Sequence, residues 1–233
     1  NICREGDKNI NSYVYPQYPM EKIMDIMRPI YEKAVADAKA ADTPEKRRGV
    51  GIAWGGFNVT EGGGDSAEVA LELMPGNKIR KYDTWHAMGQ GATTGSLVVT
   101  LEALKEMHLT PEDIQLIQND TKTCPDTGMA GASRSLYMDG NATIIAANKL
   151  LAAMRKEDGT LRTYDEMKAE GIETKYLGRY ETNTTPGLCR LDPNTGIGDP
   201  TPAFTYCLNL AEVEVDTKTG KTTVLKFTCV DFV

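Results

Sequence analysis

Glycine residues crowd the stretch from Trp85 to Gly95, where Gly89, Gly91 and Gly95 leave the backbone open to a ligand. Gln90 carries a hydrogen-bond donor and an acceptor. An alternating segment precedes this stretch and apolar residues at helical spacing follow it, so the pattern predicts a strand, a glycine turn and a helix N-terminus. Such a junction favours a phosphate or another electron-rich group. The alternative is a connection that only lets the helix fold back on the sheet.

A second stretch, Pro125–Arg134, consists of small and polar residues and runs directly into a helical pattern. Ala130, Gly131, Ala132 and Ser133 are therefore expected at another helix N-terminus. The Ser133 hydroxyl and the Arg134 guanidinium suit a phosphate. Two alternatives stay open, because Ser133 could cap the helix and Arg134 could pair with a nearby acid.

The surrounding elements predict an α+β fold with mixed or antiparallel sheets and packed helices. Strands are expected at 49–54, 67–73 and 78–85, in a small antiparallel sheet whose glycine-rich rim includes Gly62–Gly64. A further strand at 114–118 precedes the second stretch, so both stretches are expected beyond strand carboxyl ends, where α/β proteins commonly bind ligands. The predicted regions are 1–172, which carries both stretches, and 173–233, a strand-rich layer that ends in a hairpin.

Composition restricts the classes of function. The chain has 33 acidic and 26 basic residues, and the resulting net charge of −7 disfavours a nucleic-acid or anionic-membrane surface. No apolar run has the length of a membrane span. Five scattered cysteines and two histidines offer little for a metal site built from protein ligands, and they favour a reducing compartment. A cytoplasmic location is expected, with the periplasm left open.

Several motifs, in order along nearly the whole chain, resemble the molybdenum hydroxylases, the family of xanthine dehydrogenase and aldehyde oxidoreductase. Met88-Gly89-Gln90-Gly91 is similar to that family's pterin loop, and 125–134 is similar to its second cofactor loop. Supporting matches are Gly140-Asn141-Ala142, Tyr164-Asp165-Glu166 and 211–216. The likeness looks closest to bacterial aldehyde oxidoreductases. It implies that the chain is part of a molybdopterin-binding domain.

The resemblance also implies the roles of the two loops. Met88, Gly89, Gln90 and Gly91 would contact the pterin of a molybdopterin, which often carries a cytosine dinucleotide in this family. Ala130, Gly131, Ala132 and Ser133 would surround its phosphate or nucleotide side. The pterin and not the protein would hold the molybdenum, which fits the shortage of histidine and cysteine.

By the same resemblance, the parent protein would use water to hydroxylate aldehydes or N-heteroaromatics such as purines. Iron–sulfur clusters, with or without FAD, are expected elsewhere in the complex, and the catalytic glutamate is expected beyond Val233. The chain alone is therefore predicted to be inactive, with the remaining segments or subunits as partners in a homo- or hetero-oligomer. Two alternatives are a non-catalytic module kept for subunit assembly and an unrelated phosphate or nucleotide enzyme. The second is disfavoured because the chain lacks a Walker-type Gly-Lys-Ser/Thr motif.

Overall fold

The computed structural model describes residues 4, 6–8, 14, 18–59, 65–182, 191–198, 201 and 203–232. Contacts divide the chain into two compact units, and each is described by itself. We name the first the strand unit, and it comprises Asn1–Asn58, Leu191–Gly198 and Ala203–Val233. The second, the loop unit, comprises Val59–Arg190 and Asp199–Pro202.

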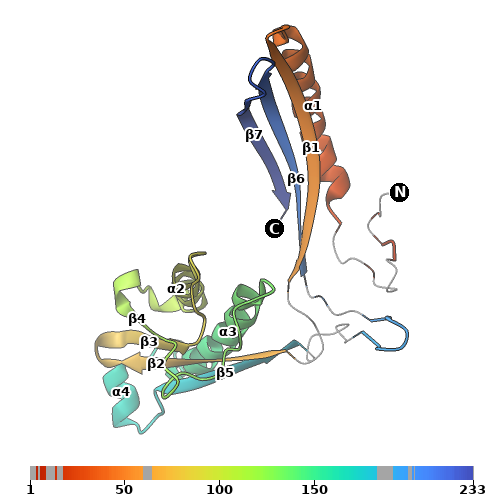
Figure 1. The fold of residues 1–233 in the computed structure, drawn as a ribbon. Coiled ribbons are helices and arrows are strands. Elements are labelled where there is room, and N and C mark those ends of the chain that lie inside the picture. The colour runs from red at the N-terminus through yellow and green to blue at the C-terminus, as the bar shows by residue number, and fades with distance from the viewer. Residues whose placement is uncertain are drawn as a thin grey trace. The chain divides into compact units, whose positions relative to one another are not determined.

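The strand unit is a helix on a three-stranded sheet (Figure 1). The helix is α1 (Met20–Ala41), and the sheet has the order β1 (Lys46–Val59), β6 (Ala203–Asp216) and β7 (Thr222–Phe232). Strands β6 and β7 pair antiparallel, as the hairpin pattern predicts. The buried apolar residues come from one face of α1 and from β6, and they are Met20, Ile23, Met27, Ala34, Tyr206, Leu208 and Leu210.

The partner of β1 differs from the prediction. The strand was expected beside 67–73 and 78–85, but it pairs with β6 in the other sheet. It is also longer than predicted, because residues 46–48 before the predicted strand and 55–59 after it belong to it. Lys46 and Arg48 form ion pairs with Glu214 of β6, at 2.8 and 2.6 Å. An alternating pattern identifies a strand, but these long-range contacts determine its partner.

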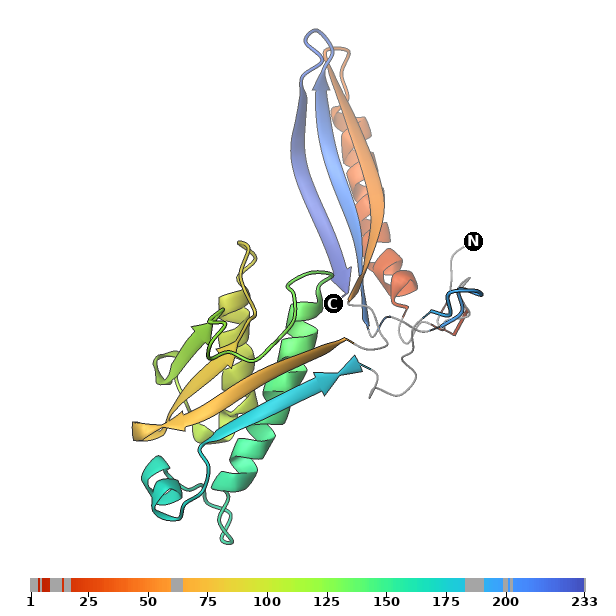
Figure 2. The same cartoon turned by 60° about the horizontal axis from the view of Figure 1, so that its bottom comes forward.

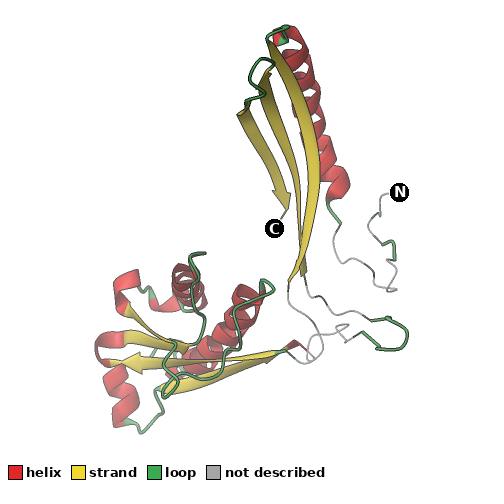
Figure 3. Cartoon of the chain, viewed as in Figure 1, coloured by secondary structure: helices red, strands yellow, loops and turns green. Residues whose placement is uncertain are grey.

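The loop unit is a four-stranded mixed sheet covered by helices (Figure 3). Its strand order is β4 (Ile114–Gln118), β3 (Lys78–Asp83), β2 (Ser66–Met74) and β5 (Lys175–Glu181). Strand β2 is antiparallel to both β3 and β5, which confirms the predicted pairing of the second and third strands. Strand β3 is parallel to β4. The α+β fold class is confirmed.

Two long helices, α2 (Ala92–Ala103) and α3 (Arg134–Met154), pack against this sheet and against each other. The short helical elements are η1 (Pro75–Asn77), η2 (Lys105–Met107), η3 (Pro111–Asp113) and α4 (Tyr164–Ala169). The core between helices and sheet is built from Leu71, Leu73, Ile79, Leu104, Ile114, Ala146, Ala147, Leu150, Leu151, Met154 and Met167. Because β3, α2 and β4 form a crossover between parallel strands, the connections after β3 and β4 leave the same edge of the sheet.

The boundaries of the two units differ from the predicted division into 1–172 and 173–233. Strand β5 lies beside β2 in the loop unit, whereas residues 20–59 share a sheet and core with β6 and β7. The glycine triplet 62–64, predicted as part of a rim, lies outside the described residues. Among the described residues, none of the helices combines the length and the apolar character that a membrane span requires.

Candidate functional site

The two predicted loops begin next to each other at one edge of the loop unit. We name Trp85–Gly91 the glycine loop and Pro125–Ser133 the second loop. Thr84 and Thr127 join them through a reciprocal pair of hydrogen bonds, in which each backbone N–H donates to the other hydroxyl oxygen, at 2.9 and 3.0 Å. Helices α2 and α3, which follow the loops, lie side by side and begin at the same end of the unit (Figure 2).

The glycine loop presents exposed backbone in a conformation that suits glycine. Gly89 has φ 104° and Gly91 has φ 80°, and Gly91 is the residue that precedes the first turn of α2. A Cβ built on either glycine meets no atom within 4 Å, so the space beside the backbone is open. The Gln90 side chain bends back, and its Oε1 accepts a hydrogen bond of 2.5 Å from the Met88 N–H. Its Nε2 donors are therefore what this side chain offers to a ligand.

The second loop is organised around Arg134, whose side chain is only 4% exposed. Its Nε and Nη2 donate to the two carboxylate oxygens of Asp65, at 2.6 and 2.8 Å. Nη1 donates to the carbonyls of Thr127 and Met129, at 3.0 and 2.7 Å, and Nη2 donates to the Ser66 carbonyl. The expectation that this guanidinium faces a phosphate is wrong, because the chain itself uses its donors. The alternative, an ion pair with an acid, is what the structure contains.

The predicted residues Ala130, Gly131, Ala132 and Ser133 lie at the end of the second loop, immediately before α3. Ala132 and Ser133 both adopt positive φ, at 48° and 53°, and both are exposed. Ser133 occupies the N-cap position, but its hydroxyl does not cap the helix. Ala130 and Gly131 precede them and are partly exposed. The small side chains from Ala130 to Ser133 thus leave the N-terminus of α3 accessible to a ligand.

The helices that follow the two loops lack the side-chain caps and acidic residues that usually satisfy the free N–H groups and the positive charge of a helix N-terminus. Within the described residues 65–182, neither α2 nor α3 has a capping hydrogen bond from its N-cap side chain or an acidic residue in its first turn. In contrast, α4 has a complete capping box between Thr163 and Glu166, and η3 has one between Thr110 and Asp113. The positive ends of α2 and α3 are therefore available to an anion.

A group of buried charges beneath the loops was not foreseen from the sequence. The side chains of Lys81, Asp83 and Asp139 are all fully buried, and Lys81 lies 2.7 Å from Asp139 and 3.3 Å from Asp83. Two signals could have indicated it. Lys81 and Asp83 alternate on one face of a strand, and Asp139 lies on the same helical stripe as Ala142 and Ala146.

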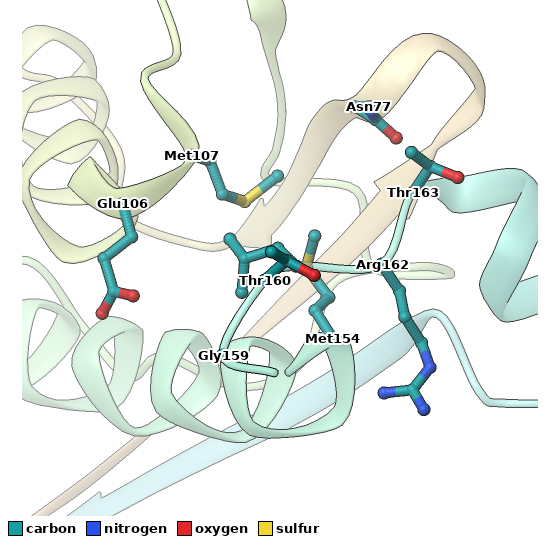
Figure 4. Close-up of a pocket in the computed structure, with 9 residues that line it drawn as sticks. Asn77, Glu106, Met107, Met154, Gly159, Thr160, Arg162 and Thr163 are labelled. Carbon is teal, nitrogen blue, oxygen red and sulfur yellow. The ribbon is translucent and has the colours of Figure 1, made fainter. Parts of the chain in front are cut away.

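A cavity of about 380 Å³ lies elsewhere on the loop unit, near Asn77 at the start of β3 (Figure 4). Strand β3 begins beside this cavity and ends at the opposite side of the sheet, where the two loops begin. The charged side chains that line the cavity have partners, since Glu106 pairs with Arg155 and Arg162 pairs with Glu170. We therefore place the candidate site at the two loops and not in this cavity.

The residues of the site do not include a set of metal ligands. Among the described residues, no group of three or more histidine, cysteine, aspartate or glutamate side chains lies close enough together to hold a metal ion. The loops instead present backbone N–H groups, small side chains and one amide. This arrangement suits a ligand that carries phosphate or polar ring atoms.

The sequence from 27 to 232, which contains both loops, matches the molybdopterin cofactor-binding domain family. The chain belongs to this family. It is 36% identical over 224 residues to an aldehyde oxidoreductase of Megalodesulfovibrio gigas, a match that covers 96% of this chain and 24% of that protein. The chain thus spans about a quarter of the length of this relative.

Solved structures agree with this assignment. The crystal structure of the aldehyde oxidoreductase from Desulfovibrio desulfuricans superposes with a TM-score of 0.91 at 38% identity, over 99% of this chain and 25% of that one. A carbon monoxide dehydrogenase from Oligotropha carboxidovorans shares the fold, with a TM-score of 0.61 at 18% identity over 95% of this chain and 31% of that one. The molybdopterin-binding character of the chain and its likeness to aldehyde oxidoreductases, both predicted from the motifs, are confirmed.

Proposed function

We propose that the glycine loop and the second loop of this chain hold the molybdopterin of a larger oxidoreductase that acts on aldehydes. The observation that supports this most is the pairing of two open loops, each leading to an uncapped helix N-terminus, at one edge of one sheet. Aldehydes are favoured over N-heteroaromatics because the relatives at 36% and 38% identity are named aldehyde oxidoreductases. A xanthine dehydrogenase of Dictyostelium discoideum matches at only 26%.

The residues of the site fit such a cofactor. The open space beside Gly89 and Gly91 admits a planar ring close to the backbone, and Gln90 Nε2 supplies hydrogen-bond donors to its polar edge. Met88, exposed at the same loop, supplies apolar contact. Ala130, Gly131, Ala132 and Ser133 let phosphate or nucleotide groups approach the positive end of α3. When bound, the molybdopterin supplies the metal and the redox chemistry that adds oxygen from water to the substrate.

The rest of the proposal concerns the parent protein. Iron–sulfur clusters, with or without FAD, would take up the electrons elsewhere in the complex, and other segments or subunits would complete the site and supply its general base. A cytosine dinucleotide on the pterin would place further phosphate near the second loop. Oligomeric assembly and a cytoplasmic location belong to the same proposal.

A matched pair of glycine substitutions in the full-length protein tests the site. Gly91 and Gly76 have nearly the same positive φ, at 80° and 76°, and a Cβ at either meets no atom within 4 Å. Gly91→Ala and Gly76→Ala therefore impose similar backbone strain, but only Gly91 lies in the proposed site. We expect Gly91→Ala to lower molybdenum and pterin content severalfold, with Gly76→Ala close to the wild type.

The same preparations distinguish the proposal from its alternatives. Oxidation of aliphatic and aromatic aldehydes, compared with purines, identifies the substrate class. Full cofactor content in both variants would show that the glycine loop is not part of the cofactor site. A wild-type protein that assembles with its partners but contains no pterin would favour the non-catalytic module.

A further inference from the structure

The three buried charges beneath the loops do not have equivalent surroundings. Lys81 lies between two carboxylates, and its Nζ donates to Asp139 Oδ2 at 2.7 Å. Asp139 also accepts from the Thr143 hydroxyl, at 3.3 Å, and its Oδ1 has no hydrogen-bond partner among the described residues. Asp139 is thus bound to the strand and to its own helix.

Asp83, in contrast, accepts hydrogen bonds from the glycine loop and from the elements next to it in the fold, α2 and β4. Its Oδ2 accepts from the Ser96 hydroxyl of α2 at 2.7 Å. Its Oδ1 accepts from the Gln118 amide at the end of β4, at 2.8 Å, and from the backbone N–H of Trp85, at 3.3 Å. The Asp83 carbonyl accepts from the backbone N–H of Asn119, at 3.1 Å, where the chain leaves β4.

These bonds fix Trp85, the first residue of the glycine loop. Its N–H is bound to Asp83, and its carbonyl accepts from Gln118 Nε2 at 3.0 Å. Its indole ring is buried against the first turn of α2, where a Cβ on Gly95 would lie 3.2 Å from the ring. The exposed residues from Met88 to Gly91 continue from this anchored point. Their position therefore depends on how firmly Trp85 is held.

We propose that Asp83 is a positioning residue, which acts through Trp85 and Gln118 to hold the glycine loop in its cofactor-binding position. The inference rests on the proposed function for the identity of the ligand. Asp83 does not face the ligand itself, because its side chain is fully buried. Its two oxygens serve different donors, because Oδ1 accepts from Trp85 and Gln118 and Oδ2 accepts from Ser96 and faces Lys81. An asparagine cannot reproduce both sides, since an amide oxygen that keeps the Oδ1 bonds turns its NH₂ group toward the Lys81 ammonium, and the reverse orientation turns it toward the Trp85 and Gln118 donors.

The structure provides a matched control for this inference in Asp139. Asp83→Asn and Asp139→Asn are the same chemical change, and both remove a fully buried carboxylate from Lys81. Only Asp83 is bound to the backbone of the glycine loop and to Gln118. A purely structural role of the charges predicts similar losses from both variants. A positioning role predicts a difference.

The test uses the full-length protein and measures molybdenum and pterin per polypeptide, together with hydrogen–deuterium exchange of residues 85–91. We expect Asp83→Asn to lower cofactor content at least fivefold and to increase exchange across 85–91 at least tenfold. Asp139→Asn should retain more than half of the cofactor and leave exchange at 85–91 unchanged. Equal losses in the two variants, or full cofactor content in Asp83→Asn, would overturn the proposal.

A second variant covers the case in which Asp83→Asn does not fold. Gln118→Met has similar side-chain length, leaves all three buried charges in place, and removes the amide that donates to Asp83 and Trp85. We expect a loss of cofactor of two- to threefold with increased exchange at 85–91, and unchanged behaviour would overturn the proposal. If the wild-type protein contains no pterin, the proposed function fails, but the exchange data still decide whether Asp83 holds the loop.

Discussion

The second loop is held from within by the buried guanidinium of Arg134, whereas the glycine loop is held at its first residue, Trp85. Arg134 binds two carbonyls of the second loop and ties them to Asp65. In the glycine loop, the residues from Met88 to Gly91 are exposed, with a local bond between Gln90 and Met88. The difference indicates that the second loop is formed before a ligand arrives, and that the glycine loop leaves its backbone groups available to one.

Removal of Arg134 should produce the largest effect. Arg134→Met removes the donors that this side chain supplies to Asp65 and to three carbonyls, and a broken buried ion pair costs about 3–5 kcal/mol. We expect hydrogen exchange of residues 127–133 to rise more than about a hundredfold, the equivalent of about 3 kcal/mol in local opening. Exchange in the glycine loop should change much less.

Arg179 offers the control for this variant. It pairs with Glu68 and Glu181, but its side chain is 51% exposed, so Arg179→Met should cost less than about 1 kcal/mol. If the two variants lose similar thermal stability, or if 127–133 stays protected without Arg134, the guanidinium does not organise the second loop.

The same glycine substitution should distinguish the loops. Gly128 has φ 79°, and a Cβ there would lie 2.8 Å from two guanidinium nitrogens of Arg134. We expect Gly128→Ala to cost about 2–4 kcal/mol, from backbone strain and displacement of Arg134. Gly91→Ala has the strain without the clash and should cost about 1–2 kcal/mol. Thermal unfolding of the full-length variants measures both, and equal shifts would contradict the described packing.

Asp139, one of the buried charges beneath the glycine loop, should make the stability of the fold depend on pH. Burial raises the pKa of Asp139 from 3.8 to about 6, although Lys81 opposes this shift. The folded protein therefore binds this proton more tightly than the unfolded chain does. The resulting stabilisation is complete below about pH 4 and is lost as the pH rises through 6, by at most about 3 kcal/mol.

The variant Asp139→Asn isolates this dependence, because asparagine resembles the protonated acid. Relative to the wild type, Asp139→Asn should gain thermal stability at pH 8 and show little difference below about pH 4. A variant that is destabilised equally at both pH values would contradict the shifted pKa.

The smallest effect on stability is expected at the tip of the glycine loop. Gln90→Ala removes an exposed side chain whose bond is confined to Met88, so the thermal midpoint should change by less than the equivalent of about 0.5 kcal/mol. Cofactor content should nevertheless fall, because the amide donors are lost. Unchanged content would place Gln90 outside the contact surface.

Local patterns in the sequence predicted much of the candidate site. The glycines after an alternating strand and the small residues before a helical stripe were enough to place both loops at helix N-termini. An ion pair of Arg134 with an acid was one of two alternatives that the sequence left open. The choice between them could not be made from the sequence, because the partner Asp65 lies in a distant part of it. The sheet that contains β1 was also missed, since its ion pairs with Glu214 connect opposite ends of the chain. The buried position of Lys81 depends on Asp139 in the same way.

The most direct test of the central claim is a structure of the full-length protein with its cofactor, at a resolution that shows the pterin. We predict that the pterin contacts Gly89–Gly91 and that its phosphate or nucleotide groups lie against Ala130–Ser133, with Arg134 still bound to Asp65. A pterin bound away from both loops, for example at the cavity near Asn77, would contradict the account.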